Sequence, residues 1–155
     1  MKPLKHLKSV DLLIIHCVGN RCNCPFSTES LINTGEARFG QVSYHWYIKR
    51  DGSIESLLPE NVQGVHARHY NHCSLGIVYE GGLDEKGRAT DTRTEAQKTS
   101  MRSLLEELTE IYPEAHIYGH CELPHVAKDC PCFPASKFYA DLQPENRNAK
   151  CVSLN

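Results

Sequence analysis

The stretch Leu12-Leu13-Ile14-Ile15-His16-Cys17 decides the fold. Its four consecutive aliphatic residues are typical of a strand that is covered on both faces, as the central strands of parallel sheets are. A second short apolar run, from Ala115 to Tyr118, is followed by Gly119 and His120. Each run therefore predicts a buried strand that delivers a histidine at its end.

Strand and helix patterns follow this run along the chain. Val10–Cys17 is followed by strands predicted at Val42–Lys49, Ile54–Leu58, Ser74–Tyr79 and His116–Tyr118, and by helices predicted at about 28–38, 95–112 and 135–142. Ser27 or Thr28 can cap the first helix and Thr92 or Thr94 the second. In the second helix the apolar residues form one helical stripe: Met101, Leu104, Leu105, Leu108 and Ile111.

This order predicts one α/β domain with a central mixed β-sheet flanked by helices. We expect the domain to span residues 1–142 and a polar tail to occupy residues 143–155. The chain has 155 residues, of which 40% are hydrophobic and 23% charged, with a formal net charge of −2. These values are typical of a globular domain and give no long-range attraction to nucleic acid. No apolar run approaches the length of a membrane span, so we expect no membrane insertion.

The N-terminal segment does not resemble a secretory signal, because Asp11 and His16 interrupt the apolar run that follows its basic residues. We therefore expect the protein to be cytoplasmic as synthesised. The chain has eight cysteines, but an oxidising compartment has little support without a signal. The Cys22–Cys24 and Cys130–Cys132 pairs are separated by one residue, which is closer than structural zinc sites usually require. We expect most of these cysteines to be free thiols.

Three potential metal ligands fall at the ends of predicted elements. His16 and His120 end strands, and Cys130 lies on a proline-bounded loop. Two imidazoles and one thiolate leave a tetrahedral zinc with one open position, the arrangement of a hydrolytic site. Residues next to a ligand in an extended segment point the other way, which favours Cys130 over Cys121 and Cys132 but leaves both as alternatives.

Two further side chains have suitable chemistry near these ligands. Lys128, two residues before Cys130, is expected to face the metal and to stabilise an oxyanion. Tyr44 can present its hydroxyl to the same site. Alternation along the predicted strand puts Tyr44 and Trp46 on one face and His45 on the other, and only one face can look into a cleft.

Five ordered blocks of the sequence resemble the zinc-dependent N-acetylmuramoyl-L-alanine amidases of the type-2 group, which includes phage amidase lysozymes and peptidoglycan recognition proteins. The blocks are Ile14–Cys17, Ser43–Gly52, Gly64–Ala67, Ser74–Ile77 and Gly119–Phe133. They extend over most of the chain, which makes the resemblance specific.

The resemblance implies hydrolysis of the amide between N-acetylmuramic acid and L-alanine in peptidoglycan. It implies one zinc ion per chain, bound by His16, His120 and Cys130. Tyr44 falls on the family's catalytic tyrosine and Lys128 on the lysine that phage-type members use beside the metal. We also expect substrate contacts from the following residues: His66, His45 and Trp46. A monomer that acts on the cell wall after release or export, as a phage or prophage endolysin does, fits this resemblance.

Three other interpretations remain open at this point. A peptidoglycan-binding module of the same fold would bind without cleaving, although such modules typically lack the cysteine ligand. A cysteine-rich zinc or redox protein would depend on Cys22, Cys24 and Cys132 instead of His16. A third interpretation keeps the fold and the metal but cleaves within the stem peptide.

Overall fold

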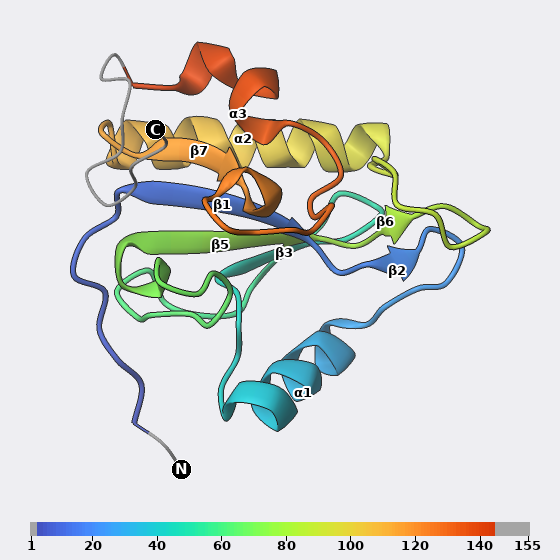
Figure 1. Ribbon diagram of the computed structural model, residues 1–155, viewed down its shortest axis with the longest axis horizontal. Helices are drawn as coiled ribbons and strands as arrows, with labels where there is room; N and C mark the ends of the chain where they lie inside the picture. Colours follow the sequence, from blue (N-terminus) through green and yellow to red (C-terminus); the bar gives the residue numbers. More distant parts are fainter. Residues whose placement is uncertain (1–2, 145–155) are drawn as a thin grey trace.

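In the computed structural model, residues 3–144 are described and form a sheet with helices on both faces (Figure 1). The main sheet has five strands in the order β4-β3-β5-β1-β7, and a two-stranded sheet pairs β2 with β6. The strands are β1 Leu12–Cys17, β2 Asn20–Arg21, β3 Trp46–Ile48, β4 Ile54–Ser56, β5 Ser74–Tyr79, β6 Gly82–Leu83 and β7 His116–Gly119. The helices are α1 Thr28–Phe39, α2 Glu95–Ile111 and α3 Ala135–Phe138, with 3-10 turns η1 Asn71–Cys73, η2 His120–Glu122 and η3 Ala140–Leu142.

Strand β1 is the centre of the sheet and pairs in parallel with β5 on one side and β7 on the other. Its residues 12–16 are all buried, as a strand covered on both faces requires. Only β4 runs antiparallel, as the second strand of the hairpin with β3. The prediction of an α/β domain with a mixed sheet flanked by helices is therefore confirmed.

The two faces of β1 serve different purposes, because successive side chains point to opposite faces. Leu13 and Ile15 pack into the larger core, to which α2 contributes Met101 and Leu105. Leu12, Ile14 and His16 point to the other face. There Leu12 and Ile14 are covered by loop residues such as Ala67 and Leu123. His16 is thus the last inward residue on the face that loops cover, at the open end of the sheet.

The helix ends follow the predicted capping pattern. Ser27 caps α1 by accepting a hydrogen bond from the Ser30 amide, and Gly40 ends the helix in the left-handed conformation. Thr94, and not Thr92, caps α2 in a capping box with Gln97. Ile111 does not join the buried stripe of α2, since it lies in the last turn and is 53% exposed.

The segment before β3 differs from the prediction. Strand pairing begins at Trp46 and not at Val42, so strict alternation does not extend back to Tyr44. Trp46 packs in the core beneath α2, whereas Tyr44 packs beside Tyr47 and Val78 on the α1 side. The prediction that Tyr44 and Trp46 share a face is therefore wrong. The short strands β2 and β6 were also not predicted, because two residues are too few to show a period.

The sequence also predicted that the chain does not insert into a membrane and that it ends in a polar tail. Between residues 3 and 144 no helix has both the length and the apolar character needed to cross a membrane. Most of the predicted polar tail, residues 145–155, lies outside the described residues, as does Cys151.

Candidate metal centre and active site

The parallel register of the central strands brings the two predicted histidines together. Ile15 of β1 pairs with Gly119 of β7, so His16 and His120 follow on neighbouring strands at the same edge of the sheet. Their ring centroids are 4.6 Å apart. Ligands of open α/β sheets bind at this carboxyl edge.

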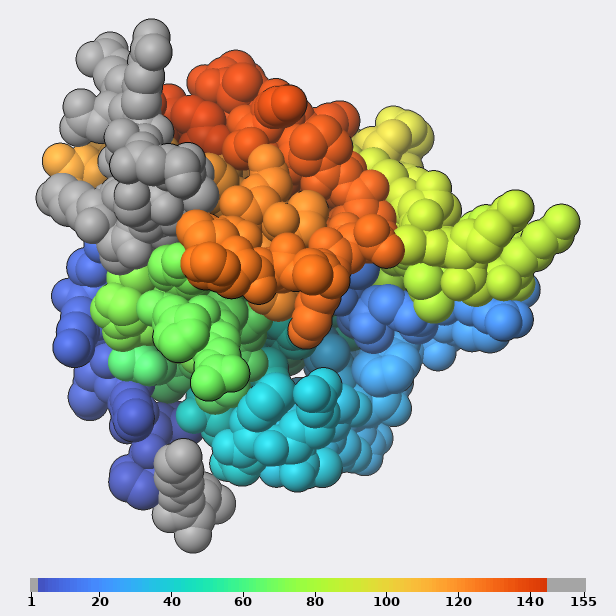
Figure 2. Space-filling view, in the orientation of Figure 1, coloured from blue at the N-terminus to red at the C-terminus, as the bar shows by residue number. Residues whose placement is uncertain are grey.

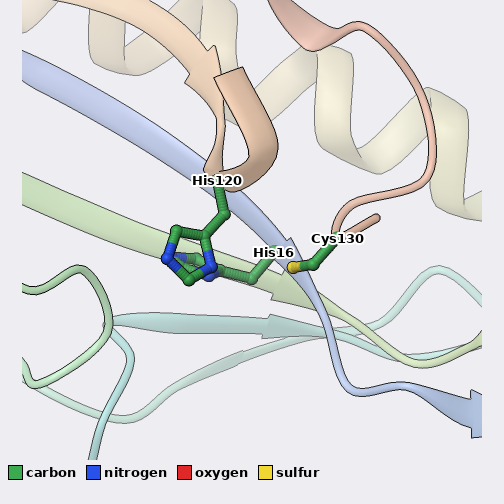
Figure 3. Close-up of side chains that lie close together, drawn as sticks. All are labelled: His16, His120 and Cys130. Carbon is green, nitrogen blue, oxygen red and sulfur yellow. The ribbon is translucent and has the colours of Figure 1, made fainter. Parts of the chain in front are cut away.

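Cys130 comes back to the same point from the loop after β7 (Figure 3). One ligand atom from each of His16, His120 and Cys130 lies within 4.8 Å of the others, the one such group of His, Cys, Asp or Glu among residues 3–144. The Cys130 sulfur accepts a hydrogen bond from the Cys17 amide at 3.2 Å, and the Cys130 carbonyl accepts one from the Cys121 amide at 2.7 Å. The fold thus brings together the three residues that the sequence selected as ligands.

Glu122 fixes the loop on which Cys130 is carried. Its carboxylate accepts hydrogen bonds from the amides of Gly119 at 2.7 Å and Ser136 at 3.0 Å, and from the Ser136 hydroxyl. Hydrogen bonds to a charged acceptor are stronger than neutral ones. The carboxylate therefore ties the end of β7 to the start of α3, on either side of the loop.

The electrostatics of the three side chains suit metal binding. Hydrogen bonding with Cys17 lowers the pKa of the Cys130 thiol, against the effect of burial, and the neighbouring side chains of His120 and His16 act in the same direction. Burial lowers the pKa of His16. A thiolate and a neutral imidazole are the forms that bind a metal ion.

The donor set and the spacing are appropriate for zinc. Nitrogen and sulfur ligands lie about 2.0–2.3 Å from a tetrahedral zinc, so the ligand atoms should be about 3.3–3.8 Å apart. In the structure the three ligand atoms all lie within 4.8 Å of one another, which is close enough for one zinc ion to be bound after small side-chain movements. The alternative thiols do not join this group. Cys132 donates to the Gly82 carbonyl at 3.3 Å, and Cys121 lies outside the set of ligand atoms.

A cavity of about 810 Å³ opens in front of the three ligands. In the space-filling view the surface is hollowed where the loop after β7, the segment around residue 70 and α1 meet (Figure 2). Tyr44, His66 and Lys128 all line this cavity. Burial raises the pKa of Tyr44, so its hydroxyl keeps its proton at neutral pH. Its ring centroid is 5.2 Å from that of His16.

His45 and Trp46 do not line this cavity, although the sequence suggested substrate contacts for both. His45 is fully buried, with Nε2 bonded to the Val62 carbonyl at 2.7 Å and Nδ1 accepting from the Gly76 amide at 3.0 Å. Trp46 is 9% exposed in the core beneath α2. Both side chains are therefore part of the protein interior and are not available to a substrate in this cavity.

Sequence reasoning did not single out two cationic residues of the cavity. Arg38, from the last turn of α1, and Arg68, two residues after His66, both line it and are exposed. An arginine in a helix or a loop has no distinguishing spacing, so only the folded chain identifies them. With Lys128 they outnumber Asp129, the one carboxylate among residues 3–144 that lines the cavity.

Comparison with known proteins agrees with this geometry. Residues 6–133 match the N-acetylmuramoyl-L-alanine amidase family, Amidase_2. The chain belongs to this family. It is 34% identical over 136 residues to the endolysin of Escherichia phage T7, covering 87% of this chain and 89% of the phage protein.

Solved structures show the same fold. The endolysin amidase LysCS from Clostridium intestinale URNW has a TM-score of 0.75 and 26% identity, covering 93% of this chain and 90% of its own. Drosophila PGRP-LB, at 20% identity, has a TM-score of 0.68 and covers 95% of this chain and 91% of its own.

The amidase hydrolyses the amide between N-acetylmuramic acid and L-alanine, and its substrate is peptidoglycan. This family assignment excludes the interpretation as a cysteine-rich redox protein. In addition, Cys22 and Cys24 belong to no metal-binding group among the described residues. Among the described residues, the following cysteines are free thiols, as the sequence predicted for most of the cysteines: Cys17, Cys22, Cys24, Cys121, Cys130 and Cys132.

Proposed function

We propose that the amidase is zinc-dependent, with one zinc ion held by His16, His120 and Cys130. The observation that carries this proposal is the convergence of these three ligand atoms within 4.8 Å at the edge of the sheet. When bound, zinc supplies polarisation of the scissile carbonyl and a coordinated water of lowered pKa. With three protein ligands, a four-coordinate zinc would keep one position for these tasks.

We infer that Tyr44 and Lys128 act on the substrate beside this site. Both line the cavity that the three ligands share. The Tyr44 hydroxyl, which stays protonated, can donate a hydrogen bond to the carbonyl oxygen as negative charge develops on it. The Lys128 ammonium can stabilise the same oxygen by its charge. Donors placed where charge develops contribute most in a site that excludes water.

His66 and the cations of the cavity are proposed to contact the substrate. The stem peptide of peptidoglycan carries carboxylates, and Arg38, Arg68 and Lys128 give their part of the cavity a positive charge. Complementary charge favours the encounter with an acidic peptide. His45 and Trp46 are left out of this proposal, because both are buried away from the cavity.

We propose that the amidase domain covers residues 1–142 and acts as a monomer. The three proposed ligands and the cavity in front of them lie within this one domain. We further propose that the protein reaches the cell wall after release or export, in the manner of the endolysins to which it is similar. Size-exclusion chromatography with light scattering tests the monomer.

The zinc dependence is tested by digesting purified sacculi and analysing the products by mass spectrometry. The zinc-loaded protein should release intact stem peptides with a free L-alanine amine. A chelator should abolish their release and added zinc should restore it. Continued release from protein shown to be metal-free would overturn the zinc proposal, and shortened peptides would instead indicate cleavage within the stem.

A further inference from the structure

The proposed ligand His16 has a buried histidine as its hydrogen-bond partner. His16 Nε2 lies 2.9 Å from Nδ1 of His66, and the two rings meet edge to face. His16 is 2% exposed and His66 is 9% exposed. Only one of the two nitrogens can supply the proton of this hydrogen bond, so the protonation of His66 determines that of His16.

A chain of hydrogen bonds beyond His66 decides which nitrogen holds the proton. The Ser74 hydroxyl donates to the backbone carbonyl of Tyr70 at 2.6 Å. Because a carbonyl has no proton to give, the single hydroxyl proton of Ser74 is committed to it. Nε2 of His66 lies 3.2 Å from the same hydroxyl oxygen, which is left as an acceptor. Nε2 of His66 must therefore carry the proton and donate it.

The proton on Nε2 of His66 determines which nitrogen of His16 is protonated. With its proton on Nε2, neutral His66 has a bare Nδ1, which accepts from Nε2–H of His16. Nδ1 of His16 then has no proton and a free lone pair. We propose that His66 and Ser74 are positioning residues that hold His16 in the Nε2-protonated form, so that Nδ1 is the nitrogen that binds the metal.

The surroundings of His66 are built to hold its ring in one place. A Cβ atom at Gly76 would lie 2.8 Å from Cγ of His66, so the ring is packed directly on the backbone of β5. The Asn71 side-chain oxygen accepts from the amides of His66 at 3.0 Å and Ala67 at 2.9 Å. A ring fixed in this way has little freedom to turn and exchange its two nitrogens. Outer partners of this kind orient a ligand histidine and strengthen its binding to the metal.

This inference rests on the proposed metal site, but its first test does not need the metal. Long-range proton–nitrogen NMR of the metal-free protein, at mildly alkaline pH, reports which nitrogen of each histidine is protonated. We expect the Nε2-protonated form for both His16 and His66. Ser74→Ala should leave a mixture of forms at His66. A proton on Nδ1 of His16 in the wild-type protein would overturn the proposal, whether or not the protein binds zinc.

The second test compares two isosteric variants. In His66→Asn the amide oxygen takes the place of Nδ1 and can still accept from His16. In His66→Gln the amide group takes the place of Nε2, next to Ser74, and does not reach His16. Loss of such a partner typically lowers metal affinity about 10–100-fold. We expect His66→Gln to raise the zinc Kd by about that factor and His66→Asn to stay much closer to wild type.

Zinc Kd is measured by competition with a chelator, and the fold of each variant is checked by circular dichroism without metal. Equal zinc affinity in both variants and the wild type would overturn the positioning role. So would an equal loss in both variants, because the loss would then follow the removal of the imidazole and not of the Nδ1 acceptor. If the wild type itself binds no zinc, the zinc proposal fails, and the NMR result still decides the hydrogen-bond chain.

Discussion

The metal site joins two regions of different construction. His16 comes from the central strand, is buried, and is hydrogen-bonded to His66. His120 and Cys130 come from the segment after β7 and are partly exposed. That segment is held by the hydrogen bonds of Glu122 and by the bond from the Cys121 amide to the Cys130 carbonyl. Tyr79 and Cys17 of the sheet also donate to it, at the Pro131 carbonyl and the Cys130 sulfur.

This difference indicates a division of tasks between the sheet and the loop. The sheet region fixes one ligand before any metal arrives, as part of the folded core. The loop region carries the other two, together with Lys128, at the edge of the cavity. A ligand that is fixed in advance by the sheet favours a defined metal geometry. Ligands on a loop that can adjust allow a large substrate to enter the site.

The largest expected effect is the loss of any one ligand. His16→Ala, His120→Ala and Cys130→Ala should each abolish stoichiometric zinc and turnover, because two ligands do not hold a catalytic zinc tightly. The comparison predicts that His16→Ala destabilises the metal-free protein more than the other two variants do, since it leaves Nδ1 of His66 buried without its donor. That cost is about 1–3 kcal/mol.

Metal content by mass spectrometry, turnover on sacculi and urea unfolding in chelator test these variants together. Full activity in zinc-free His120→Ala would contradict the ligand assignment. An equal loss of metal-free stability in His16→Ala and Cys130→Ala would contradict the division between the two regions.

A smaller effect is expected from the groups that face the substrate. Tyr44→Phe and Lys128→Ala should bind zinc normally and lose about 10²–10³-fold in kcat, as removal of one oxyanion donor does. Zinc titration and steady-state kinetics on sacculi separate binding from rate. Unchanged turnover in one variant would remove that residue from the mechanism, and lost zinc would show that the residue supports the site instead.

The sequence predicted the sheet region of the site better than its surroundings. His16 could be recognised because the run from Leu12 to Ile15 makes a strand and the strand places its next residue at the sheet edge. The hydrogen-bond chain through His66 and Ser74 could not. It depends on which loop packs on β5 and on the direction of a hydroxyl proton. Neither feature produces a periodic pattern of residues that could be recognised in the sequence.

The alternation of side chains along extended backbone predicted one residue of the site correctly and another pair wrongly. Alternation favoured Cys130 over its neighbours, and the structure brings that thiol to the histidines. The same rule was wrong between Tyr44 and Trp46, because the backbone enters β3 only at Trp46. Alternation describes paired strands, and it does not apply to the residues that lead into them.

Removing the metal should act on the loop more than on the sheet. Without zinc, His120 and Cys130 lose their shared partner, and the loop between them opens more often. Lys128 lies in this loop and is exposed, so trypsin should cleave after it about tenfold faster in chelator, which corresponds to about 1.4 kcal/mol of opening free energy. Mass spectrometry of the early fragments identifies the site. Faster cleavage throughout the chain would indicate global destabilisation instead of a local effect.

The smallest effect, the response to acid, should come from the sheet region. Burial lowers the pKa of His16, His45 and His66, so the folded metal-free protein resists protonation at these rings. The unfolded chain takes up these protons as the pH falls through about 6.5. Stability should therefore be constant above this pH and decline below it, by up to about 1.4 kcal/mol per pH unit for each proton.

His45 offers a test of this effect, since it is not a proposed ligand and its ring nitrogens bond only to backbone groups. In His45→Gln the amide can still donate to the Val62 carbonyl, but it no longer titrates. Urea unfolding of the metal-free protein at several pH values measures the free energy of unfolding. Below about pH 6.5 this free energy should fall less steeply for the variant than for the wild type, by up to about 1.4 kcal/mol per pH unit, the contribution of one proton. An unchanged slope would mean that His45 takes up its proton equally in both states. The acid response would then belong to His16 and His66, the two rings whose hydrogen bond prepares the metal site.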